Sequence, residues 1–163
     1  MSLCVLCAQR GTSCCVNRDI LITTADAGRI AAYYGDLNFF EYRKPSSTAY
    51  VEQDDDPEWN ILTVRVDGSR RVLNRQNESL CFFLTETGCR LSATVRPLVC
   101  RLHPVEYTAA GVTGVSPECP VQFLAHPETL LDSLQMNLTE AESWRRQLYE
   151  ELRQDALNRK KVA

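Results

Sequence analysis

The chain has 163 residues, a formal net charge of -3 and a hydrophobic content of 44%. A chain of this length can bury an apolar core as a single compact domain, and its negative charge disfavours a dedicated nucleic-acid-binding protein. The first residues lack the basic and apolar run of a secretory signal, and no stretch reaches the ~20 apolar residues of a membrane-spanning helix. We therefore expect a cytoplasmic protein that binds neither nucleic acid nor membrane.

The first secondary-structure signal along the chain is a helix start. Thr23-x-x-Asp26 resembles a capping box with a shorter acid, and apolar residues follow it at helical spacing, which predicts a helix over 24–34. After this helix, Asn38 is expected to cap a brief turn through residues 39–42. The aromatic rings of that turn are expected to pack on the core.

An acidic, turn-rich stretch follows at residues 52–58. Its carboxylates raise the question of a calcium or magnesium site, because these cations prefer oxygen ligands. The spacing matches no calcium-binding loop, and runs of charge are usually solvated surface. The sequence therefore favours an exposed loop here.

The middle of the chain predicts three short β-hairpins. Each consists of two segments rich in β-branched or aromatic residues on either side of a turn that contains glycine. The paired segments are 61–66 with 71–73, 81–84 with 89–91, and 105–108 with 112–115. The second hairpin would bring Cys81 and Cys89 close together across its strands.

Beyond the third hairpin the pattern becomes helical. Leucines over 130–136 predict one helical segment, and Thr139-x-x-Glu142 predicts the start of a longer amphipathic helix. We expect residues 126–163 to form a helical extension that docks on a domain formed by residues 1–125. The alternative is that this helix binds a protein partner or forms a homodimer. Together these elements predict an α+β fold with short antiparallel strands, an N-terminal helix and a C-terminal helical tail.

Eight cysteines carry the strongest functional signal. Four lie in the N-terminal segment and four follow in the β-rich middle: Cys4, Cys7, Cys14, Cys15, Cys81, Cys89, Cys100 and Cys119. Thiolate is a soft ligand that binds zinc and iron strongly, and two cysteines three residues apart can hold one metal. Neighbouring side chains tend to diverge, so the sequence leaves open whether Cys14 and Cys15 share a site.

Disulfide bonding is the alternative explanation for these cysteines. Eight in 163 residues is about 5%, below the roughly 8–10% that is typical of a short secreted disulfide scaffold. In a reducing compartment a cysteine framework is more often metal-binding than disulfide-bonded. We therefore expect a metal ion or cluster, either zinc or iron–sulfur, with all eight cysteines as candidate ligands.

The residues around the cysteines form a recognisable series. It runs from the cluster ending in Cys14-Cys15 through Asp26-x-x-Arg29-Ile30 and Cys81-Phe82-Phe83-Leu84 to Arg96-Pro97-Leu98-Val99-Cys100-Arg101. This series resembles the YkgJ-type cysteine-cluster family, which is described as zinc- or iron-chelating. The resemblance covers about residues 4–120 and departs from the family where six residues separate Cys7 from Cys14. It implies metal binding and leaves the biochemical role open.

Similar cysteine patterns also occur in flagellin lysine methylases. That similarity implies the alternative of a cluster-dependent enzyme for redox chemistry or methyl transfer. The sequence has no glycine-rich strand-to-helix turn that would cradle a nucleotide-like cofactor, and no motif of a nucleophile with its base. We therefore expect a structural or metal-handling role, and we assign no residue a catalytic role.

Three arginines adjoin candidate ligands. A site built from thiolates is anionic and attracts cations, so Arg90, Arg96 and Arg101 are expected to surround it, with surface salt bridging as the alternative. Of the two histidines, His103 is expected to pack beside the site rather than to ligate, and His126 is expected to face solvent.

Overall fold

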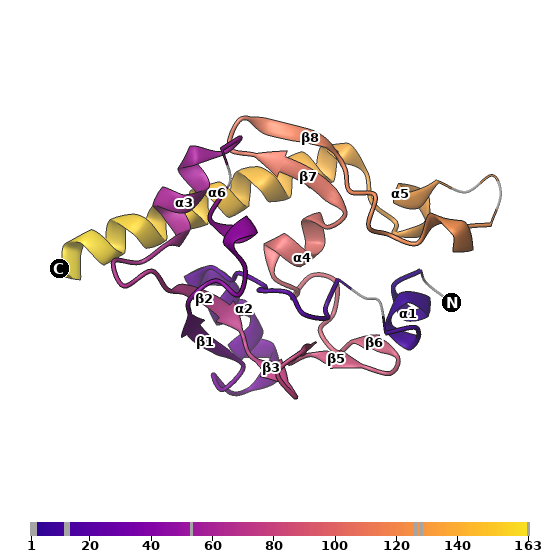
Figure 1. The fold of residues 1–163 in the computed structure, drawn as a ribbon, viewed down its shortest axis with the longest axis horizontal. Coiled ribbons are helices and arrows are strands. Elements are labelled where there is room, and N and C mark those ends of the chain that lie inside the picture. The colour runs from indigo at the N-terminus through magenta and orange to yellow at the C-terminus, as the bar shows by residue number, and fades with distance from the viewer. Residues whose placement is uncertain (1–2, 12–13, 53, 126, 128, 163) are drawn as a thin grey trace.

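The computed structural model describes residues 3–11, 14–52, 54–125, 127 and 129–162, and it has the α+β architecture that the sequence predicts. Its α-helices are α1 (Leu3–Gln9), α2 (Thr24–Tyr34), α3 (Pro57–Thr63), α4 (Leu98–Leu102), α5 (Leu130–Ser133) and α6 (Leu138–Val162), and its short 3₁₀ turns are η1 (Thr48–Tyr50) and η2 (Val121–Phe123). Figure 1 shows α6 running along one long side of the molecule, with the N-terminal helix α1 near the opposite end from the C-terminus. His126 lies outside the described residues.

The strands pair two by two. They are β1 (Phe40–Arg43), β2 (Arg70–Leu73), β3 (Arg75–Gln76), β4 (Leu80–Cys81), β5 (Leu84–Thr85), β6 (Gly88–Cys89), β7 (Val105–Thr108) and β8 (Gly111–Val115). In the described part of the chain they form four antiparallel pairs, β1 with β2, β3 with β4, β5 with β6, and β7 with β8. Such small sheets leave side-chain packing to join the parts of the fold.

The capping box before α2 is confirmed, together with both ends of the helix. The Thr23 hydroxyl accepts the Asp26 N–H at 2.9 Å, and the Asp26 carboxylate accepts the Thr23 N–H at 3.2 Å. At the other end Gly35 has a φ of 89°, and its N–H reaches the Ala31 carbonyl at 2.8 Å. Glycine suits this end because its lack of a β-carbon permits the left-handed conformation.

The first predicted hairpin is wrong, and so is the turn through 39–42. The helix α3 occupies 61–63, the first half of the predicted strand, because Pro57 stands at its first turn, where a missing N–H costs nothing. Strand β2 pairs instead with β1, so Phe40 lies opposite Leu73. Residues 40–42 therefore lie in a strand that follows a turn at 38–39, and its partner strand begins 30 residues further along the chain.

The second predicted hairpin is shifted along the chain. Its turn is present between β5 and β6, where Leu84 pairs with Cys89. Cys81 belongs instead to β4 and pairs with Arg75. The Gln76 side-chain amide holds this arrangement, since it donates to the carbonyls of Cys81 at 3.0 Å and Phe82 at 2.9 Å. The third predicted hairpin is confirmed as β7 and β8.

The acidic stretch is exposed at Asp54 and Asp55, as predicted, but not at Asp56. Asp56 is buried, and its carboxylate accepts the Tyr149 hydroxyl and the Ala109 N–H. A charge run does not reveal that one of its members has a partner on a helix more than 90 residues away. Asp56 therefore serves the core between α3, α6 and the β7–β8 hairpin.

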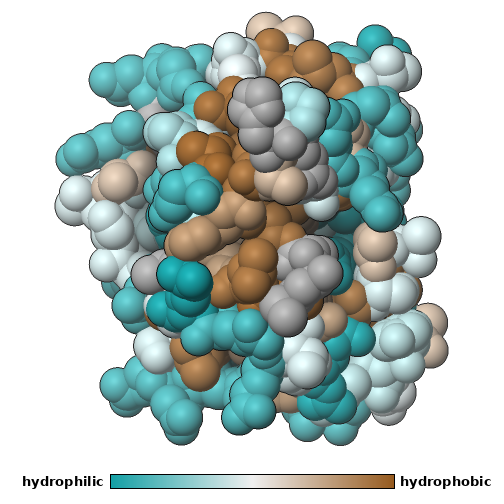
Figure 2. All heavy atoms as spheres, turned by 90° about the vertical axis from the view of Figure 1, so that its right-hand side faces the viewer, coloured by the Kyte–Doolittle hydropathy of each residue, from teal (hydrophilic) through white to brown (hydrophobic). Residues whose placement is uncertain are grey.

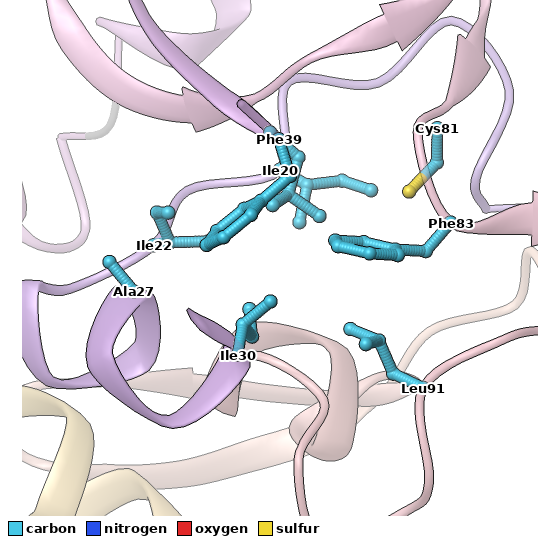
Figure 3. Packing of buried hydrophobic residues seen from close by; sticks show 9 residues of the cluster. Ile20, Ile22, Ala27, Ile30, Phe39, Cys81, Phe83 and Leu91 are labelled. Atoms are coloured by element: carbon cyan, nitrogen blue, oxygen red, sulfur yellow. The ribbon is translucent and has the colours of Figure 1, made fainter. Parts of the chain in front are cut away.

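Two clusters of buried side chains form the core. The first gathers around Phe39 and Phe83, and Figure 3 shows the sulfur of Cys81 directed toward its aliphatic side chains. The second lies under α6 and includes Leu98 and Leu102 of α4 with Leu148 of α6. Cys100 packs against the first cluster from α4, so α4 lies between the two.

The C-terminal helix packs on the rest of the fold through the second cluster. It begins at Leu138 rather than after Thr139, because the Asn137 side chain accepts the Glu140 N–H at 2.8 Å. The segment before it is helical only over Leu130–Ser133, since Gln135 has a φ of 53° and cannot continue a helix. The apolar side of α6 contacts α3 and α4.

Glu151 connects α6 to α2 through charged hydrogen bonds. Its carboxylate accepts from Arg29 at 2.7 Å and from the Thr23 hydroxyl at 2.5 Å. Burial raises the pKa of Glu151, but the hydrogen bonds from Arg29 and Thr23 outweigh it, so that its pKa lies below the ordinary value. A carboxylate with a lowered pKa stabilises the fold above the unfolded pKa, and this contribution is lost as the pH falls through the folded pKa.

We expect Glu151→Gln to lower the free energy of unfolding by about 1–2 kcal/mol at pH 7, because it weakens hydrogen bonds to a charged group. The difference from the wild type should shrink as the pH falls below about 4, where the wild-type carboxylate also becomes neutral. Urea unfolding of both proteins at pH 7 and at a pH below about 4 measures this difference. Glu150→Gln is the control, since Glu150 is exposed on the same helix. Equal losses in the free energy of unfolding of the two variants would contradict the stabilising role of the Glu151 hydrogen bonds.

Candidate metal centre

Four separate segments contribute five neighbouring thiols, which we call the central thiol group: Cys14, Cys15, Cys81, Cys89 and Cys100. The N-terminal segment reaches β4 through a bridge between Val16 and Leu80, and the Cys81 N–H donates to the Cys15 carbonyl at 2.8 Å. Cys89 enters from β6 and Cys100 from α4. Hydrogen bonds join Cys15 to Cys14 and Cys81, and Cys89 and Cys100 lie within range of electrostatic interaction with Cys15.

Cys15 is the common neighbour of the group. Its side chain makes hydrogen bonds with the thiols of Cys14 and Cys81, and these bonds are the largest cause that raises the pKa of each. Burial raises the pKa of Cys89 and Cys100, and Coulomb repulsion from Cys15 raises both further. Coulomb repulsion falls with distance, so these effects indicate that the sulfurs are close. Adjacent Cys14 and Cys15, which the sequence left open, join the same group.

Two sulfurs of the group accept backbone N–H groups in the same manner. The Phe83 N–H donates to Cys81, and the Leu91 N–H donates to Cys89. In both cases the donor is two residues after the cysteine. Each bond lowers the pKa of its thiol against the larger effects that raise it, because an N–H donor favours the thiolate. These donors were not foreseen, since backbone groups leave no mark in a sequence pattern.

The group extends from the core to the surface. Cys81 is 6% exposed and belongs to the first core cluster, whereas Cys14 is exposed. Cys15, Cys89 and Cys100 are half-buried between them.

A second set of thiols, which we call the outer thiol group, comprises Cys4, Cys7 and Cys119. Burial raises the pKa of Cys119 to about 11, and Coulomb repulsion from Cys4 and Cys7 contributes. The Cys119 sulfur lies 3.6 Å from Nε2 of His103. Cys4 also lies near Cys15 and Cys89, so the two groups adjoin each other.

The Cys119–His103 pair does not have the properties of an activated nucleophile. Burial lowers the pKa of His103, and the pKa of Cys119 is raised. A catalytic thiol beside an imidazole has the opposite shift, because the imidazolium stabilises the thiolate. Sequence reasoning assigned His103 to packing beside the site, and the structure adds its direct contact with a candidate ligand.

The three predicted arginines differ in where they lie. Arg96 donates a hydrogen bond to Cys89, and its charge lowers the pKa of Cys4 and Cys100 against the burial that raises them. Arg90 instead lies over the ring of Tyr34, at 5.8 Å from its centroid. Arg101 donates to the carbonyls of Arg96 and Thr94. Arg96 is thus the arginine of the three that contacts a thiol.

The described thiols do not form a complete metal coordination shell in this conformation. Within the residues that the structure describes, no group of three or more histidine, cysteine, aspartate or glutamate side chains has the arrangement of a finished metal site. Pairs of thiols are in contact, while the central and outer groups each bring together more than two candidate ligands. Filling a metal site would therefore require side-chain adjustment.

The outer thiol group faces one end of the molecule. The helix α1, which carries Cys4 and Cys7, lies at that end beside the β5–β6 hairpin (Figure 1). Figure 2 looks onto this end and shows a hydrophobic band between hydrophilic margins. Among the described residues, none of the helices combines the length and the apolar character needed to cross a bilayer.

Comparisons with protein-family models, with curated proteins and with solved structures find no match for this chain. The resemblance to the YkgJ-type family therefore stays a prediction.

Proposed function

We propose that this chain is a metal-binding protein whose central thiol group holds a zinc ion or an iron–sulfur cluster in a structural or metal-handling role. The observation that carries the proposal is the shared environment of Cys81 and Cys89. Each sulfur accepts an N–H from the residue two positions on, and each has Cys15 as a neighbour. Donors directed at a sulfur orient it and stabilise it as a thiolate, which is the form that binds metal.

The chemistry of the donor set fits a soft metal. The central group offers only thiols, and thiolates favour zinc and iron–sulfur iron over hard cations such as magnesium. Its members come from residues 14–15, from the strands at 81 and 89, and from α4. When bound, such a metal supplies a link between segments that are far apart in the chain.

The charge around the group also fits. Four thiolates around a divalent metal leave a net negative charge, which nearby cations and N–H groups stabilise. Arg96 supplies the cation, because its guanidinium donates to Cys89 and lies near Cys4 and Cys100. Arg90 lies over Tyr34 and Arg101 donates to backbone carbonyls, so we assign the charge-balancing role to Arg96, with Arg101 as a further positive charge near Cys100.

Elemental analysis of protein purified without air tests the proposal. We expect zinc or iron in a fixed ratio to protein, with a brown colour and acid-labile sulfide if the metal is an iron–sulfur cluster. The variant Cys100→Ser should lose the metal of the central group. The control is Val99→Ala, which removes neighbouring half-buried side-chain volume from α4 but leaves every thiol in place.

Circular dichroism must show that both variants are folded before their metal contents are compared. The proposal is wrong if the wild-type protein contains no metal and takes up neither zinc nor iron with sulfide under reducing conditions. It is also wrong if Cys100→Ser binds as much metal as Val99→Ala. Alkylation of the denatured protein counts the thiols and separates metal binding from disulfide bonding.

A further inference from the structure

We infer that His103 is a metal ligand, and that with Cys4, Cys7 and Cys119 it forms a second, zinc-selective site beside the central thiol group. The inference deepens the proposed function and rests on it. It starts from the contact between the Cys119 sulfur and Nε2 of His103, which joins a thiol from one loop to an imidazole at the end of α4.

The distance between these two atoms is the first argument. In a tetrahedral zinc site, bonds of about 2.3 Å to sulfur and about 2.0–2.1 Å to nitrogen set the two ligand atoms about 3.5 Å apart. The Cys119 sulfur and His103 Nε2 are 3.6 Å apart, so they already form one edge of such a tetrahedron. No large backbone movement is needed to bind zinc at this edge.

The backbone fixes both ends of this edge. His103 follows the last residue of α4, and its N–H donates to the Val99 carbonyl at 3.1 Å. The Cys119 carbonyl accepts the Val121 N–H at 2.8 Å at the start of η2. Two side chains held by separate backbone contacts therefore place a thiol beside an imidazole.

The helix α1 supplies the other two thiols. Cys4 and Cys7 are three residues apart on α1, so they lie on the same side of the helix. Both lie close enough to Cys119 for Coulomb repulsion between the sulfurs. The helix is held there by β6, since a β-carbon on Gly88 would stand 3.5 Å from a methyl group of Val5. Cys4 and Cys7 are therefore the candidates for the two remaining ligands of the tetrahedron.

The mixture of donors selects the metal. Three thiolates and one imidazole are a common set for closed structural zinc sites, whereas iron–sulfur clusters are usually held by four thiolates. The outer group is therefore a zinc site even if the central group holds a cluster. This assigns roles to all eight cysteines, with four donors in the outer site and five thiols available to the central one.

Cobalt(II) is the probe for this site, because its visible d–d bands move to shorter wavelength when nitrogen replaces sulfur among its ligands. We expect the reduced full-length protein to bind two cobalt ions, one with a mixed sulfur and nitrogen spectrum. His103→Gln should lose one of the two ions together with that spectrum. His103→Cys should keep two ions and show bands of all-sulfur coordination. His126→Gln, which alters the other histidine of the chain, should behave as the wild type.

Failure of this inference can be told from failure of the proposed function. If His103→Gln keeps the metal content and spectrum of the wild type, the histidine ligand is refuted while metal binding by cysteines stands. A wild-type spectrum of all-sulfur coordination alone refutes it in the same way. If the wild type binds no cobalt and no zinc, and takes up no iron with sulfide, both proposals fall.

Discussion

Removal of the bound metal is expected to lower the melting temperature of the protein by about 8–16 °C. A ligand present at about a thousand times its dissociation constant stabilises the folded state by about 4 kcal/mol, and each kcal/mol shifts the melting temperature of a chain of this size by about 2–4 °C. The effect should be large here because β3, β4, β5 and β6 are only two residues long. Few backbone hydrogen bonds hold the segments that carry Cys81 and Cys89.

Thermal unfolding followed by circular dichroism, with and without a strong chelator, measures this effect. Cys100→Ser provides the control, because a variant that has already lost the central metal should respond much less to the chelator. The direction in which metal affinity changes with pH follows from the pKa values of the thiols. The thiols of Cys81, Cys89 and Cys100 have raised pKa values and must lose protons to bind metal, so the apparent metal affinity should rise with pH. An unfolding transition that chelation leaves unchanged would contradict the proposed role of the metal.

Shortening Leu148 to alanine is expected to lower the free energy of unfolding by about 2–5 kcal/mol. Leu148 is 0% exposed and lies in the second core cluster with Leu98 and Leu102 of α4 and Leu62 of α3. Removing its outer carbons loses apolar burial and leaves a cavity, because the helices around it are joined to other elements and can close only partly. The free energy of unfolding of a folded domain is roughly 5–15 kcal/mol in total, so the variant should lose a large part of its stability.

Urea unfolding of Leu148→Ala beside Leu157→Ala measures the difference. Leu157 is on the same helix but 53% exposed, so its truncation removes the same atoms with an expected loss of only about 0.5 kcal/mol. Similar losses for the two variants would mean that α6 is not docked through this side, and would revive the alternative in which the helix binds a partner. A size-exclusion measurement of the wild type then distinguishes a homodimer.

Local signals in the sequence predicted the elements that depend on neighbouring residues. The capping box at Thr23 and Asp26 defines α2 through side-chain bonds within one turn. The segments around Gly111 form the β7–β8 hairpin, since its strands are joined by a tight turn. The prediction over 61–66 failed because Pro57 starts a helix and because the partner of β2 is β1. A pairing partner that lies far away in sequence leaves no local periodicity.

The candidate site shows the same division. The cysteines could be named from their chemistry and spacing, but their grouping could not, because it depends on the bridge between Val16 and Leu80 and on the placement of α4. The predicted pairing of Cys81 with Cys89 across one hairpin was wrong, yet Cys81 makes a hydrogen bond with Cys15, and Cys89 interacts electrostatically with the same residue. The sequence could not distinguish the role of Arg96 from that of the other two arginines, or predict the contact of His103 with Cys119, because both depend on side-chain contacts in the fold.

The division of the core into two clusters has a consequence for synthesis on the ribosome. All members of the first cluster lie between Ile20 and Leu91, so they can pack while the rest of the chain is still being translated. The second cluster needs residues up to Leu152 and has to wait for α6 to leave the exit tunnel. Until then Cys100, which packs against the first cluster from α4, lies next to a second cluster that α6 has not yet covered.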